Sequence, residues 1–87
     1  MFSQEQIDNL KSQAMKILQK KFSENNDKEA ELLANQLLKV SPDDIQILQI
    51  LGLIKYRTNE YQQSIEYFEK AISLDPDNYE NYNNIGL

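Results

Sequence analysis

The sequence predicts an all-α fold in which antiparallel helix-turn-helix hairpins stack as an α-solenoid of about five helices. Apolar residues recur at three- and four-residue spacing along most of the chain, as they do on one face of an amphipathic helix. The 87 residues include only two Gly and two Pro, which suits helical segments joined by short turns. Pro42 and Pro76 lie 34 residues apart, as do Asn25 and Asn59, so the pattern repeats with a fixed period.

The first hairpin is predicted from a capping signal, an apolar stripe and a break. Ser3 and Gln6 have the spacing of a capping box, in which each side chain satisfies a backbone N–H of the first turn. The break at residues 23–26 separates this helix from a second one at about 28–39, for which Asp27 is the expected N-cap. The stripe of the first helix comprises Ile7, Leu10, Ala14, Ile17, Leu18 and Phe22, and that of the second Ala30, Leu33, Ala34, Leu37 and Leu38.

The second hairpin follows Ser41-Pro42, with Asp43 as the expected N-cap of its first helix. This third helix is apolar on nearly every side, so several neighbours must cover it. Its apolar residues are Ile45, Ile47, Leu48, Ile50, Leu51, Leu53 and Ile54. A fourth helix is predicted over 61–74, ended by Asp75-Pro76, and a fifth from about Asn78 to the end of the chain.

Residues 45–78 resemble a tetratricopeptide repeat. Leu48, Leu51-Gly52, Ser64, Phe68, Ala71 and Pro76 stand at the spacing of that family's signature, W-x2-L-G…A-x3-F…P. Three residues depart from it: Leu48 at the usual aromatic, Lys55 at the usual Tyr and Ser64 at the usual first Ala. Tyr82 and Ile85-Gly86 begin a further unit in the same way. The resemblance implies a right-handed superhelix.

The chain divides by this period into an N-terminal helical extension (1–10), a degenerate repeat (11–44), a full repeat (45–78) and a truncated one (79–87). The degenerate unit is expected to be an N-terminal cap, because it is polar on the face that should meet a preceding repeat. It carries Lys11, Gln13 and Lys20 where the full repeat has Ile45, Ile47 and Ile54. Gly52 is expected where the paired helix approaches closely.

The composition argues against several classes of function. The chain has no Cys and no His, so thiolate nucleophiles, the usual zinc ligands and the usual proton-transfer side chain are missing. A net charge of -5 disfavours nucleic acid and anionic membranes. The first residues lack the basic and apolar regions of a signal peptide. We therefore expect a cytoplasmic protein that is not an enzyme and has no catalytic residue, metal or cofactor.

The resemblance also implies a binding surface, since the first helix of each hairpin in this family lines a concave groove for a peptide or partner protein. Amide side chains there offer both a donor and an acceptor to a peptide backbone, and apolar neighbours can pack its side chains. The alternative to peptide binding is that the amides are merely solvated and that the apolar residues contact further repeats. The predicted groove comprises Met15, Gln19, Gln49, Ile50, Leu53, Tyr56, Asn83 and Asn84.

The same comparison with the family argues against one of its subfamilies. The members that grip the acidic tails of chaperones do so with Lys and Asn at five places, which fall here on Met15, Gln19, Ile50, Glu80 and Asn84. Only Asn84 fits, and Glu80 would repel an acidic tail.

Three functions follow from the sequence. The main expectation is a protein–protein interaction module with an amide-rich, partly apolar groove. The alternative is a recruiting or oligomerisation arm of a larger enzyme, because the repeats resemble those placed ahead of bacterial glycosyltransferase domains. A third expectation is self-association into a homo-oligomer, since the truncated third unit would leave Tyr82 and Ile85 uncovered.

Overall fold

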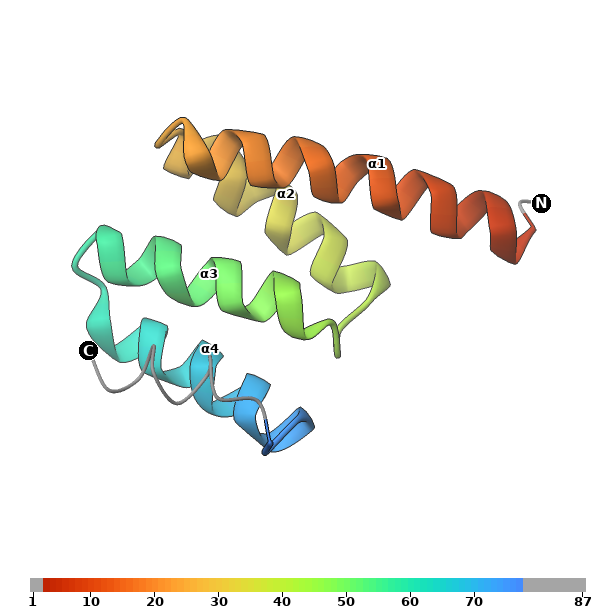
Figure 1. Cartoon of the computed structure of the whole chain (residues 1–87). Coiled ribbons are helices and arrows are strands. Elements are labelled where there is room, and N and C mark those ends of the chain that lie inside the picture. The colour runs from red at the N-terminus through yellow and green to blue at the C-terminus, as the bar shows by residue number, and fades with distance from the viewer. Residues whose placement is uncertain (1–2, 78–87) are drawn as a thin grey trace.

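Residues 3–77 are described by a computed structural model, in which they form four helices joined by short turns. The helices are α1 (Gln4–Ser23), α2 (Asp27–Val40), α3 (Ile45–Arg57) and α4 (Tyr61–Leu74). Each helix packs against the next, so that α1 with α2 and α3 with α4 form two antiparallel hairpins stacked on each other (Figure 1). The predicted all-helical class is confirmed for these residues, and the expected fifth helix lies outside them.

The helix ends repeat at the predicted period. Asn25 and Asn59 both have a left-handed backbone, with φ of 61° and 66°. In the first turn the N–H of Asn26 donates to the carbonyl of Lys21, and 34 residues later the N–H of Glu60 donates to that of Lys55. These are the closing bonds of a helix C-terminus that turns through one left-handed residue. Asn suits this position because its side chain tolerates the left-handed region.

Two of the three predicted N-caps are wrong. The capping box of α1 is confirmed, with Gln6 N–H donating to Ser3 Oγ at 3.2 Å and Ser3 N–H to Gln6 Oε1 at 2.8 Å. The cap of α3 is Asp44 rather than Asp43, because Asp44 Oδ1 accepts from the N–H of Ile47 at 3.2 Å. Asp27 is the first residue of α2 and caps nothing, since Arg57 occupies its carboxylate.

The predicted apolar stripe of α1 is only partly buried. Leu18 is fully buried, but Leu10 and Ile17 are each 52% exposed, and Ile7 is exposed as well. The 14 residues of α2 are too few to cover the 20 of α1, so the first turns of α1 extend past the hairpin (Figure 1). Ile17 is not among the residues that pack in or against the core, whereas Met15 is a core member that the predicted stripe did not include.

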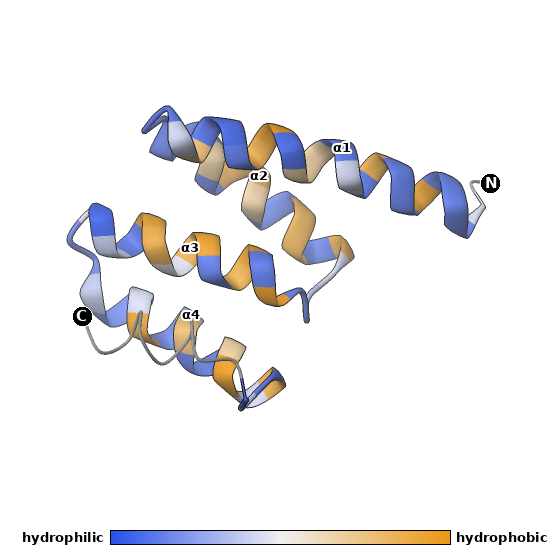
Figure 2. Ribbon diagram, viewed as in Figure 1, coloured by the Kyte–Doolittle hydropathy of each residue, from blue (hydrophilic) through white to orange (hydrophobic). Residues whose placement is uncertain are grey.

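The main core lies between the two hairpins. Its α3 members are fully buried, and Ala30 and Ala34 let α2 approach closely because their side chains are small. Figure 2 shows hydrophilic bands over much of α1. The core comprises Met15 and Leu18 of α1, Ala30, Ala34 and Leu37 of α2, and Ile47, Leu51 and Ile54 of α3.

A second set of contacts joins α3 to α4 around Gly52. Phe68 is only 1% exposed, and its ring carbons lie 2.6 to 2.9 Å from where a Cβ on Gly52 would be. The hydroxyl of Ser64 donates to the carbonyl oxygen of Gly52 at 2.7 Å. The expected close approach at Gly52 is therefore confirmed, and α3 is buried on both sides as its composition predicted.

The degenerate unit has the polar face that the sequence predicts. Gln13 and Lys20 are exposed, whereas Ile47 and Ile54 at the corresponding places of the second hairpin are fully buried. Such polarity is typical of a unit at the end of a repeat stack. The division of the chain at residues 10, 44 and 78 stays a prediction.

Candidate functional site: the groove between α1 and α3

The first helices of the two hairpins, α1 and α3, run in the same direction (Figure 1). They border a hollow of about 540 Å³. Lys11 of α1 and Asp44 at the start of α3 form an ion pair at 2.7 Å across it. We call this hollow the α1–α3 groove. Its lining residues are Asp8, Lys11, Ser12, Met15, Lys16, Gln19, Asp44 and Gln46.

Two of the predicted groove residues, Met15 and Gln19, line the α1–α3 groove. Gln19 is exposed, so its amide is accessible to a bound chain. Met15 is only 9% exposed and packs into the core, so its side chain forms part of the floor. The reason is that Met15 lies on the side of α1 that meets the second hairpin.

The other described members of the predicted groove lie further along α3. Positions 46, 49, 50 and 53 share one face of a helix by their spacing. Gln49, Ile50 and Leu53 are half-buried, and Ile50 packs against the core. Tyr56 is 42% exposed, and its ring meets that of Tyr61 edge-on at 5.4 Å. Asn83 and Asn84 lie outside the described residues.

The groove is more charged than the sequence suggested. Four of its lining residues are ionisable, and none of these four is among the predicted groove residues. Lys11 and Asp44 neutralise each other at the centre, while Asp8 accepts a hydrogen bond from Gln4 Nε2 at 3.0 Å. Within residues 3–77, neither Asp8 nor Lys16 belongs to an ion pair.

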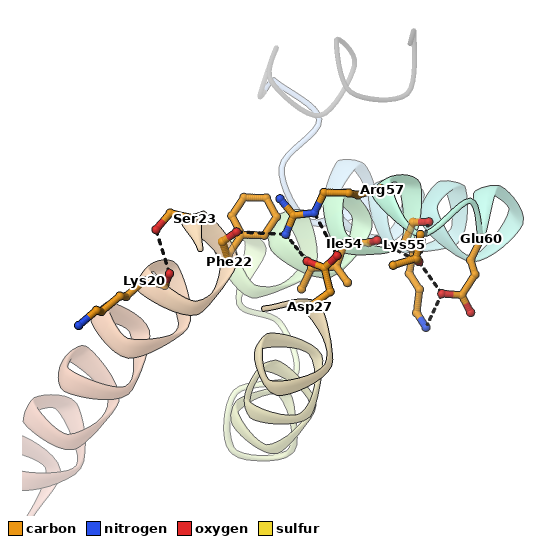
Figure 3. Close-up of polar contacts among 9 residues, drawn as sticks. Lys20, Phe22, Ser23, Asp27, Ile54, Lys55, Arg57 and Glu60 are labelled. Carbon is orange, nitrogen blue, oxygen red and sulfur yellow. Dashed lines mark hydrogen bonds and ion pairs between the residues drawn. The ribbon is translucent and has the colours of Figure 1, made fainter. Parts of the chain in front are cut away.

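Arg57 joins the two hairpins at the far end of α3. Its guanidinium donates to both carboxylate oxygens of Asp27 and, at 3.1 Å, to the carbonyl of Phe22. It also stacks on the Phe22 ring, 4.3 Å from the centroid (Figure 3). Arg57 is therefore bound within the protein, and Phe22 is covered by it.

Lys55 explains one departure from the repeat signature. It is 7% exposed and pairs with Glu31 of α2. It also pairs with Glu60 at 3.3 Å (Figure 3). The Glu31 carboxylate is the main cause that raises the pKa of Lys55 above its usual value. Thr58 Oγ1 donates to Glu60 at 2.6 Å and, with Lys55, lowers the pKa of the Glu60 carboxyl. A buried cation thus replaces the usual Tyr and links α2 to α3.

Comparison with known proteins relates the second hairpin to a known repeat. The family model of the tetratricopeptide repeat matches residues 45–78, which include α3 and α4. The second hairpin is thus similar to a tetratricopeptide repeat. In such a repeat, Gly52 and Phe68 occupy the signature positions at which the two helices meet.

Part of this chain is also similar to part of a curated protein. The DnaJ homolog subfamily C member 7 homolog of Schizosaccharomyces pombe is 30% identical over 54 residues, which is 62% of this chain. The match covers 11% of that protein, so the likeness concerns about a tenth of its length.

Other kinds of site find little support in the described part of the chain. No three acidic side chains come together there as a set of metal ligands. None of the four helices combines the length and hydropathy that a membrane span requires.

Proposed function

We propose that this chain is a non-catalytic interaction module that binds a peptide segment of a partner protein in the α1–α3 groove. Tetratricopeptide repeats mediate protein–protein interaction, and the proposal gives that role a place on this chain. The observation that carries it is the hollow bordered by the first helices of both hairpins, with accessible amides from Gln19 of α1 and Gln46 of α3.

The chemistry of the lining suits a polypeptide ligand. Each Gln amide offers a donor and an acceptor, which matches the N–H and C=O groups of an extended backbone. Met15 supplies an apolar, adaptable floor for side chains. Ile50, Leu53 and Tyr56 extend the surface along α3, on the expectation that the hairpins continue as a right-handed superhelix with its first helices on the concave side.

The other two functions expected from the sequence have no support from the described residues. Self-association through the third unit depends on residues outside the described range, and the recruiting arm of an enzyme depends on a domain outside these 87 residues. Both stay predictions, as does a cytoplasmic location.

The test is selection from a random peptide library against the whole chain. Gln46→Trp would fill the groove, whereas Gln36→Trp places the same exposed ring on α2, away from the groove residues. Selected peptides should bind the native chain and the Gln36→Trp variant and lose at least about tenfold in affinity for Gln46→Trp. Equal affinity for the two variants, or no selected peptide at all, would refute the proposal.

A further inference from the structure

The α1–α3 groove is electrically polar along its length. Asp8 lies toward one end of its α1 side and Lys16 toward the other, with the Lys11–Asp44 pair between them. That central pair is internally neutral, so the two flanking charges set the sign of the field at each end. Both flanking side chains are exposed and can meet a ligand's charges.

The spacing of the two charges defines the ligand they would fit. Eight residues of α-helix separate Asp8 from Lys16, which is about 12 Å along the helix axis. An extended chain covers that distance in about four residues, at about 3.3 Å each. A helical ligand would have its backbone groups satisfied internally and would leave the groove amides unused, so an extended segment is the better match.

We propose, resting on the peptide-binding function above, that Asp8 and Lys16 select an extended peptide with one charge order. Its basic residue pairs with Asp8, and an acidic residue about four positions away pairs with Lys16. A peptide bound in the opposite direction, or with its two charges exchanged, would place like charges together at both ends. For a segment whose other side chains fix its direction in the groove, the two charges thereby select one charge order.

The experiment uses the strongest peptide selected against the native chain and a second peptide with its acidic and basic residues exchanged. Both are measured by fluorescence anisotropy against the native chain and against a charge-swapped variant, Asp8→Lys with Lys16→Glu. The native chain should bind the first peptide about three- to tenfold more tightly than the second, and the swapped variant should reverse this preference. Added salt should reduce the difference, since the charges are exposed.

A matched control keeps the net charge but alters exposed sites outside the groove. Lys28→Glu with Glu69→Lys should leave the preference of the native chain unchanged. Equal affinity of the two peptides for the native chain, or the same preference in the swapped variant, overturns the charge-order proposal while peptide binding in the groove stands. Both proposals are overturned if the selected peptides bind the Gln46→Trp variant as tightly as the native chain, or if the library yields no binding peptide.

Discussion

Replacing Gly52 with Ala tests whether the contact between α3 and α4 is as tight as the structure indicates. Gly52 is buried in the middle of α3, and a Cβ there would lie 2.6, 2.7 and 2.9 Å from three carbons of the Phe68 ring. Ordinary contacts between carbon atoms are about 3.5–4.0 Å. The ring would therefore have to move by about 1 Å, although Phe68 is 1% exposed and has little space around it.

Two effects of opposite sign decide the result. Ala in a helix interior is favoured over Gly by about 1 kcal/mol, so helix propensity alone predicts stabilisation. Overpacking a close-packed core costs about 1–3 kcal/mol. Because the added carbon meets the ring at three atoms and the Ser64 hydroxyl holds α4 at Gly52, we take the upper part of that range. The expected net loss is about 1–2 kcal/mol in the free energy of unfolding.

The assay is urea unfolding of the whole chain followed by circular dichroism, with Phe68→Leu as the background that separates the two effects. Without the ring, Gly52→Ala should lose its penalty and become neutral or stabilising, which gives a coupling energy of about 1–3 kcal/mol between the two sites. A higher urea midpoint for Gly52→Ala in the native background would refute the reasoning, because propensity would then outweigh the contact.

Four further changes test other parts of the structure by the same unfolding assay. Asp44→Ala should cost about 1 kcal/mol as the loss of a helix cap, whereas Asp43→Ala should change little, and the reverse order would contradict the assignment of the cap. Arg57→Lys should cost about 1 kcal/mol, since Lys cannot reproduce the forked bond and ring stacking, and an unchanged midpoint would show that any cation suffices. Ser64→Ala should lower the free energy of unfolding by about 0.5–1.5 kcal/mol, because its hydrogen bond to α3 is lost. An unchanged midpoint would contradict this expectation. The folded-state pKa of Glu60 is lowered, so its stabilisation is present above the ordinary value of 4.5 and lost as the pH falls below it, and Glu60→Gln should flatten this acid dependence.

The fold could be predicted largely because its signals are local. A helix face needs only residues three and four apart, and the two left-handed turns need only Asn at the right place. Asn25 and Asn59 therefore marked the hairpin turns, and the limits predicted for α4 agree with the structure. The choice between Asp43 and Asp44 failed because either carboxylate could cap a helix after Pro42, and only the backbone path decides which one reaches the N–H of Ile47.

The contacts between hairpins could not be predicted in the same way. Arg57 and Asp27 are 30 residues apart, and nothing in a single sequence pairs them. Lys55 did give a signal, because a charged residue at a position that the repeat buries requires a counter-charge nearby. That signal could have pointed to Glu31 and Glu60, although the sequence alone could not place them. The burial of Met15 could not be predicted either, because it depends on how the second hairpin packs against α1.

These ionic contacts bear directly on the shape of the binding surface. Apolar contacts between hairpins are strong but non-directional, so they hold α1 and α3 together without fixing one register. The Lys11–Asp44 pair lies at the start of α3, and Arg57 with Asp27 and Phe22 lies at its end. Two directional contacts at opposite ends of one helix determine both its shift and its angle relative to α1. Since α1 and α3 are the walls of the groove, these pairs help to set the geometry in which a peptide would bind.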